Sequence, residues 1–267
     1  MEKAGFTEAV IEGLKAVSGN RHRLVVKVGA SVLTRADGTL DTTRVSSLVD
    51  QIVTLKKNGC EVILVTSGAV ACGRSLIPEN RKLDDMQQRQ LYAAIGQVRL
   101  MDMYYRLFIE YGVNVGQMLT IKKNFASQQE YELQKGCIDV MLQSGVLPII
   151  NENDTVSVTE LMYTDNDELS GLVAEMMGAD TLILLDSIDG VQGDGNIISQ
   201  INPGQSILSE MLEGGEGRMS SMCRTAEQVV EHGIRVLVAN GRRENVLVSL
   251  IDTPDQIVHT EFLAKKD

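Results

Sequence analysis

The sequence predicts an α/β fold, a three-layer α/β/α sandwich around a mostly parallel sheet. Short runs of apolar, β-branched residues alternate with longer segments whose apolar residues recur at helical spacing. Runs such as Leu24–Val26 and Val62–Val65 are apolar at successive positions, so both faces of these strands are expected to lie under helices. No internal repeat or low-complexity tract interrupts the alternation.

In the first half of the chain, each expected strand is an apolar run that ends at glycine or polar residues. The strands are expected over residues 24–28, 62–65, 113–117 and 146–150. Helices are expected between them, over residues 42–58, 85–111 and 127–144. The first of these helices carries one apolar stripe, made by Val45, Leu48, Val49, Ile52 and Leu55. A weaker stripe predicts a short helical extension over residues 1–20, and residues 21–267 are expected to form a single domain.

The second half of the chain repeats the alternation. Strands are expected over residues 181–185 and 236–239, followed by an edge strand over residues 257–262. Helices are expected over residues 167–177, 219–232 and 244–251. The segment 190–206 is rich in Gly, Asn and Asp, which is typical of a hairpin or a loop.

The composition excludes several classes of protein. The 267 residues carry a formal net charge of -11, and phosphate-backbone binding needs clustered Lys and Arg, so a nucleic-acid partner is not expected. No stretch has the roughly 18 apolar residues that span a bilayer, and the amino terminus lacks the apolar core of a signal peptide. The four cysteines have no metal-ligand spacing and are expected to be reduced, mostly buried thiols. These features predict a cytoplasmic protein.

The candidate site lies where the strands end, because ligands of open parallel sheets bind beyond the carboxyl ends of the strands. Small, hydroxyl, amide and acidic residues gather at four such ends. They are Gly29-Ala30-Ser31, Thr66-Ser67-Gly68-Ala69, Asn151-Glu152-Asn153-Asp154 and Asp186-Ser187. A purely structural strand end also carries Gly and Asn, so one such end is weak evidence, whereas four at one edge of the sheet predict a binding site.

Lys27 is the most informative single residue. It stands inside an apolar strand, immediately before a glycine turn. Burial of an unpaired ammonium is unfavourable, so Lys27 requires an anionic partner, and a phosphate would supply one. The alternative is an edge strand from which the Lys27 side chain extends to solvent.

Three further features each have two interpretations. The turns at Ser31 and Ser67 can bind an anion through backbone N–H groups, or they are ordinary turns and caps. The cluster 151–154 can hold the α-ammonium of an amino acid, whereas Asp165-Asn166-Asp167 is equally well explained as a helix cap. The segment 214–219 contains three glycines and one cationic residue ahead of a helix. It is either a phosphate-binding loop or a flexible loop that leads into the helix. It does not match the dinucleotide fingerprint, and the chain contains no Walker-type phosphate loop.

Together these segments resemble the glutamate 5-kinases, a branch of the amino acid kinases. The similar segments are Val25–Thr34, Thr66–Val70, Ala94–Gln97, Gly116–Leu119, Ile150–Asp154 and Asp165–Ser170. The likeness runs from about residue 23 to about residue 251. It also extends to the kinase half of pyrroline-5-carboxylate synthases. Neither their reductase half nor the C-terminal RNA-modification-type domain of many bacterial glutamate 5-kinases is expected in this chain.

The resemblance implies a reaction. ATP, with Mg²⁺, would donate its γ-phosphoryl group to the γ-carboxylate of L-glutamate, giving L-glutamyl 5-phosphate in the first step of proline biosynthesis. A carboxylate is already a nucleophile, so positioning and charge neutralisation would carry catalysis. The resemblance also implies a homodimer or homotetramer, and proline as a feedback inhibitor at or near the glutamate site.

The resemblance also implies roles for individual residues. Lys27 would contact the ATP phosphates, and Ser67, Asp154 and Asn166 would hold glutamate. Asp165 and Asp167 would order the loop around these three residues. The implied nucleotide contacts beyond Lys27 are Gly29, Ser31, Asp186, Ser187, Glu216, Gly217, Arg218, Met219, Ser220, Ser221 and Met222.

The sequence departs from the family pattern only in the nucleotide half. Asp186-Ser187 stands where the family has Thr-Asp or Ser-Asp, and Gly217-Arg218-Met219 stands where it has Gly-Gly-Met. Met222 replaces a lysine that would stabilise the charge of the transferring phosphoryl group. We expect Arg218, or failing that Arg224, to replace this lysine, since a supplied arginine accelerates other phosphoryl transferases.

Two alternatives remain open at this stage. One is an amino acid kinase that acts on acetylglutamate, aspartate or a nucleoside monophosphate, against which the cluster over residues 151–170 argues. The other is a catalytically impaired protein that binds glutamate or proline as a regulator. Met222 and the order of Asp186 and Ser187 favour this second alternative.

Overall fold

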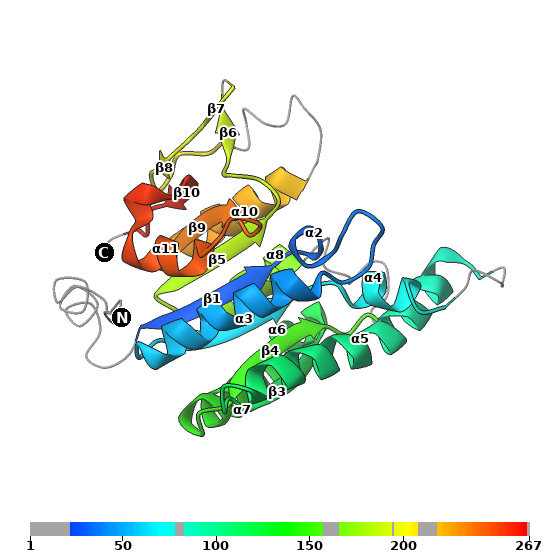
Figure 1. The fold of residues 1–267 in the computed structure, drawn as a ribbon. Helices are drawn as coiled ribbons and strands as arrows, with labels where there is room; N and C mark the ends of the chain where they lie inside the picture. Colours follow the sequence, from blue (N-terminus) through cyan, green and yellow to red (C-terminus); the bar gives the residue numbers. More distant parts are fainter. Residues whose placement is uncertain (1–21, 78–82, 157–165, 194, 208–217, 266–267) are drawn as a thin grey trace.

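The core of the protein is one large, mostly parallel sheet (Figure 1). The computed structural model describes residues 22–77, 83–156, 166–193, 195–207 and 218–265. Eight strands lie in the order β3-β4-β2-β1-β5-β9-β10-β8, and within this sheet only β9 and β10 run antiparallel. The strands are β1 (Arg23–Val28), β2 (Glu61–Thr66), β3 (Val115–Thr120), β4 (Leu147–Glu152), β5 (Thr181–Asp186), β8 (Gln200–Ile201), β9 (Arg235–Asn240) and β10 (His259–Phe262).

Helices cover both faces of the sheet, which confirms the predicted three layers. One apolar cluster joins the sheet to α2 (Ala30–Leu33), α3 (Thr42–Lys57), α5 (Asp85–Ile109) and α11 (Val246–Asp252). A second cluster joins the opposite face to α7 (Gln128–Gln143), α8 (Asn166–Met177) and α10 (Arg218–Val230). Leu24, Val26 and Val28 of β1 belong to the first cluster and Val25 to the second, so alternation places Lys27 on the α8 side.

Apart from shifts of one or two residues at the ends of other elements, the predicted elements are found with three differences. The third strand begins at Val115, because Val113 still donates its N–H to Phe108 in the turn that ends α5. The final strand, β10, is not an edge strand, since it pairs with β9 on one side and with β8 on the other. The last helix begins at Val246, because Asn245 adopts a left-handed conformation, with φ of 53°.

Smaller elements complete the described part of the chain. Within segment 190–206, β6 (Gln192–Gly193) and β7 (Asn196–Ile197) form the expected hairpin. Two short helices, α4 (Ala69–Arg74) and α6 (Lys122–Ala126), follow β2 and β3, and a 3-10 turn covers Pro254–Gln256. The expected extension over residues 1–20 lies outside the described residues. Among the helices of the described ranges, none is long and apolar enough to cross a membrane.

The backbones of α4 and α5 touch directly. A Cβ atom on Gly96 of α5 would lie 1.7 Å from the carbonyl oxygen of Ala69, and one on Gly73 of α4 would lie 1.9 Å from that of Tyr92. Only glycine allows helices to approach this closely. Because α4 follows directly from the turn at Ser67 and Gly68, this contact ties the end of β2 to α5.

We therefore expect Gly96→Ala to destabilise the protein. The added methyl group has no space, and overpacking of this kind costs about 1–3 kcal/mol or more. Gly136→Ala is the matched control, because Gly136 also lies within a helix and a Cβ there meets no atom within 4 Å. Urea denaturation should show a lower free energy of unfolding for Gly96→Ala alone. Equal stability of the two variants would contradict the contact.

Candidate active site

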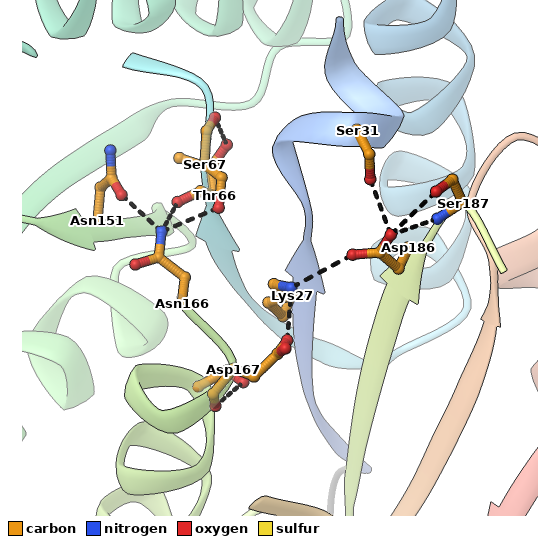
Figure 2. Close-up of polar contacts among 10 residues, drawn as sticks. Lys27, Ser31, Thr66, Ser67, Asn151, Asn166, Asp167, Asp186 and Ser187 are labelled. Carbon is orange, nitrogen blue, oxygen red and sulfur yellow. Dashed lines mark hydrogen bonds and ion pairs between the residues drawn. The ribbon is translucent and has the colours of Figure 1, made fainter. Parts of the chain in front are cut away.

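Lys27 is buried between two carboxylates at the centre of the sheet (Figure 2). Its Nζ lies 2.5 Å from Oδ1 of Asp167 and 3.9 Å from Oδ2 of Asp186, and the Lys27 side chain is 2% exposed. Because β1 lies between β2 and β5, the alternative of an edge strand is wrong. The anionic partner that burial requires is thus present within the protein. The two carboxylates hold the ammonium group in a fixed position.

Asp186, at the end of β5, connects Lys27 to the residues that follow β1 and β5. Its Oδ1 accepts hydrogen bonds from the Ser31 hydroxyl, at 2.9 Å, and from the backbone N–H of Ser187, at 2.6 Å. Gly29 allows this approach, because a Cβ atom there would lie 2.9 Å from Oδ2 of Asp186. Five residues that the sequence assigned to nucleotide binding, Lys27, Gly29, Ser31, Asp186 and Ser187, therefore lie together.

Asn166 organises the other side of the site. Its amide Nδ2 faces three acceptors, namely the Thr66 carbonyl at 2.5 Å, the Ser67 hydroxyl at 3.1 Å and Oδ1 of Asn151 at 2.8 Å (Figure 2). Asn151 in turn donates to Oε1 of Gln97, at 2.8 Å. This chain of hydrogen bonds joins the ends of β2 and β4 to the first residue of α8 and to α5. It brings together Ser67 and Asn166, two of the predicted glutamate ligands.

Tyr104 supports this arrangement from behind. Its hydroxyl lies 2.9 Å from Oγ1 of Thr66, deep in the core. Burial raises the pKa of Tyr104 to about 12, with the Thr66 hydrogen bond acting in the opposite direction. The phenol therefore stays neutral at physiological pH, and α5 holds the end of β2 through this contact.

A cleft of about 330 Å³ opens over these groups. It crosses the ends of four adjacent strands, β4, β2, β1 and β5, which span about 14 Å at the usual spacing of parallel strands. Its lining includes Lys27, Gly29, Ser67, Asn151, Glu152, Asp154, Asn166 and Asp186. At its wall, Gly68 has φ of 102°, which favours glycine and starts α4.

Two arginines of the cleft were missed by the sequence analysis. Arg74 ends α4, and Arg89 lies near the start of α5. Arg89 donates to Oδ1 of Asp154 from both Nε, at 3.0 Å, and Nη2, at 2.7 Å. The two partners are 65 residues apart, and no local pattern indicates that they meet. Glu152, recognised only as part of a polar strand end, also lines the cleft.

The predicted residues of the segment 216–222 are placed differently. Glu216 and Gly217 lie outside the described residues, as does Asp165, and Arg218 is described only as the first residue of α10. Met222 is buried in the apolar cluster against α8, with 1% of its surface exposed, and does not line the cleft. It shares this inward face with Ala226 and Val230, which follow at helical spacing.

Within the described ranges, the histidines and cysteines lie outside the cleft lining. His22 precedes β1 at the amino end of the sheet, where burial lowers its pKa and Asp180, 3.4 Å away, opposes the shift. The cysteines are unpaired, three buried and Cys137 exposed, as expected. In the described ranges no three His, Cys, Asp or Glu side chains gather as metal ligands.

Comparison with known proteins gives consistent relationships. Residues 22–240 match the model of the amino acid kinase family. The chain is 49% identical over 255 residues to glutamate 5-kinase of Bacteroides thetaiotaomicron, covering 90% of this chain and 70% of that protein. Glutamate 5-kinase of Chlorobaculum tepidum is 40% identical over 253 residues, with coverage of 91% and 70%.

The fold has close counterparts among solved structures. UMP kinase from Ureaplasma parvum superposes with a TM-score of 0.64 at 17% identity, covering 91% of this chain and all of that one. At this level of identity the likeness concerns the fold alone.

We expect Lys27→Met to destabilise the protein strongly. The substitution leaves the carboxylates of Asp167 and Asp186 buried without their cation, and breaking a buried pair in this way costs about 3–5 kcal/mol. The double variant Lys27→Met/Asp167→Asn removes one of the two charges and should recover part of the loss. Chemical denaturation measures both. A single variant as stable as the wild type would show that the Lys27 ion pair contributes nothing.

Proposed function

This chain belongs to the amino acid kinase family and, within it, to the glutamate 5-kinases, and we propose that its reaction takes place in the cleft above Lys27. The enzyme transfers the γ-phosphoryl group of ATP to the γ-carboxylate of L-glutamate and produces L-glutamyl 5-phosphate, the first step of proline biosynthesis. The observation that carries the assignment of this site is the buried Lys27, held between Asp167 and Asp186 beside the amide network of Asn166.

We assign the ATP phosphates to the side formed by β1 and β5. Lys27 would neutralise charge on the transferring phosphoryl group, and Gly29 would let the phosphates approach the backbone. Ser31 and Ser187 would complete this side through their hydroxyl and backbone groups. Since Asp167 and Asp186 already fix the Lys27 ammonium, little reorganisation is needed when charge develops.

L-glutamate is assigned to the side formed by β2 and β4. Asp154 would bind its α-ammonium, and Ser67 and Asn166 would position its carbon chain and carboxylate. The γ-carboxylate would then lie near Lys27 and the N–H of Gly68. A carboxylate needs no strong general base, so holding it in line with the γ-phosphorus is the main requirement. Asp165 and Asp167 would order the loop around these glutamate-binding residues.

The residues present fit Mg²⁺ bound together with ATP. Mg²⁺ favours oxygen ligands and is usually held by one or two carboxylates plus substrate phosphates. Asp186 lines the cleft, and the absence of a Cβ on Gly29 leaves space beside its Oδ2. Asp186 would hold the ion, which supplies further charge neutralisation at the phosphates.

Other properties of the family extend to this chain as proposals. We propose that it acts in the cytoplasm as one kinase domain over residues 21–267, and that it assembles as a homodimer or homotetramer. Proline would inhibit it by binding at or near the glutamate site.

The assay that tests the function is ADP release from Mg-ATP with L-glutamate, with the acyl phosphate trapped by hydroxylamine. Turnover should depend on L-glutamate and should be absent with aspartate, acetylglutamate or UMP. A folded protein that binds glutamate but turns over no acceptor would instead be a regulator. The burial of Met222, where the family lysine is replaced, favours this second candidate.

We expect Arg218→Ala to lower kcat by about 10³-fold or more, because Arg218 would supply the charge that Met222 lacks. The binding of L-glutamate, measured by calorimetry, should remain unchanged. Arg224→Ala provides the comparison on the same helix. If Arg224→Ala is the variant that loses turnover, then Arg224 is the substitute cation and the assignment to Arg218 is wrong.

A further inference from the structure

Arg89 is fixed at the glutamate end of the cleft by two acidic side chains. Its Nε and Nη2 both donate to Oδ1 of Asp154, and Nη2 lies 3.6 Å from Oε2 of Glu152. Both acids are at least nine-tenths buried, whereas 41% of the Arg89 side chain is exposed. The guanidinium is therefore held on one edge and open on the other.

The Arg89–Asp154 pair leaves one donor atom and one acceptor atom unused among the described residues. None of the hydrogen bonds and ion pairs among the described residues uses Nη1 of Arg89, which has two N–H groups. Likewise, within the same residues Oδ2 of Asp154 accepts no hydrogen bond, since both bonds from Arg89 end on Oδ1. One guanidinium therefore faces two carboxylates, one from Asp154 and one from Glu152. This combination matches a carboxylate and an ammonium on one carbon atom.

We propose that Arg89 determines specificity for an α-amino acid. Its Nη1 binds the α-carboxylate of the substrate, while Oδ2 of Asp154 binds the α-ammonium. This inference rests on the proposed function, in which L-glutamate occupies this cleft with its γ-carboxylate at Lys27. The α-carbon then lies at the other end of the side chain, toward β4 and Asp154.

The other cations of the cleft are less suited to this role. Lys27 is 2% exposed and is held by Asp167 and Asp186, on β1 rather than beside β4. Arg74 lies over the ring of Tyr92, 5.8 Å from its centroid, and in the described structure no carboxylate orients it. A hydrogen bond of defined direction to a carboxylate requires a fixed guanidinium, which only Arg89 provides among the described lining residues.

The test compares Arg89→Gln with Arg106→Gln. Both arginines lie on α5 and pair with an aspartate, but Arg106 is paired with Asp102 outside the cleft. We expect Arg89→Gln to raise the KM for L-glutamate about 10- to 100-fold, because the variant loses a charge-assisted hydrogen bond to the substrate. The kcat should change little. Arg106→Gln should leave both constants unchanged. An unchanged KM for Arg89→Gln overturns the proposal.

Two analogues separate recognition from a merely structural role. Glutarate lacks the α-ammonium, and 4-aminobutyrate lacks the α-carboxylate. Arg89→Gln should weaken inhibition by glutarate but not by 4-aminobutyrate. If 4-aminobutyrate binding weakens equally, Arg89 only orients Asp154 and the proposal fails.

If neither analogue inhibits, Arg89→Gln is tested in protein that already carries Asp154→Asn. Arg89→Gln should still weaken L-glutamate binding in that background, whereas a residue that acts only through Asp154 would have no further effect. Binding is measured by calorimetry, so the result does not depend on turnover. Wild-type protein that binds L-glutamate without phosphorylating it would refute the kinase function and leave the role of Arg89 testable.

Discussion

The buried charge of Lys27 is the constraint around which the site is built. A lysine at the middle of a parallel sheet is tolerated only if anions reach it, and they come from the first turn of α8 and the end of β5. Meeting this requirement brings α8 against β1 and fixes the direction of its amino end. Asn166, one residue earlier, is thereby held against the ends of β2 and β4. One electrostatic requirement thus sets the position of the amide network as well.

The acid at position 186, which departs from the family pattern, has a clear place in this arrangement. It contributes a second negative charge beside Lys27 and accepts hydrogen bonds from Ser31 and Ser187. A hydroxyl side chain could accept a hydrogen bond there but could not balance charge. The nucleotide half of the cleft is therefore organised by buried charges, whereas the glutamate half is organised by the amide network of Asn166.

Local patterns in the sequence accounted for the layers, the parallel strands and the strand ends that form the cleft, because hydrophobic periodicity reports burial directly. They did not reveal β8, which has two residues, or the second neighbour of β10. The partners of Lys27 and the pairing of Arg89 with Asp154 were also missed. Such pairs join residues far apart in the chain, and their side chains are brought together only by the packing of whole helices. Met222 was expected among the nucleotide contacts but lies in the core. Which side of α10 faces inward depends on how this helix packs against α8, and the local sequence does not determine this.

The glycine contact between α4 and α5 has a mechanical consequence. The 25-residue helix α5 is pinned near Gly96, where it crosses the backbone of α4. Arg89 lies about 10 Å from that crossing and Ile109 about 20 Å on the other side, at the usual helical rise. Tyr92 holds the same helix against Gly73 of α4, and Tyr104 holds it against Thr66 at the end of β2. The position of Arg89 is therefore set by several fixed points along α5 as well as by its own pair with Asp154.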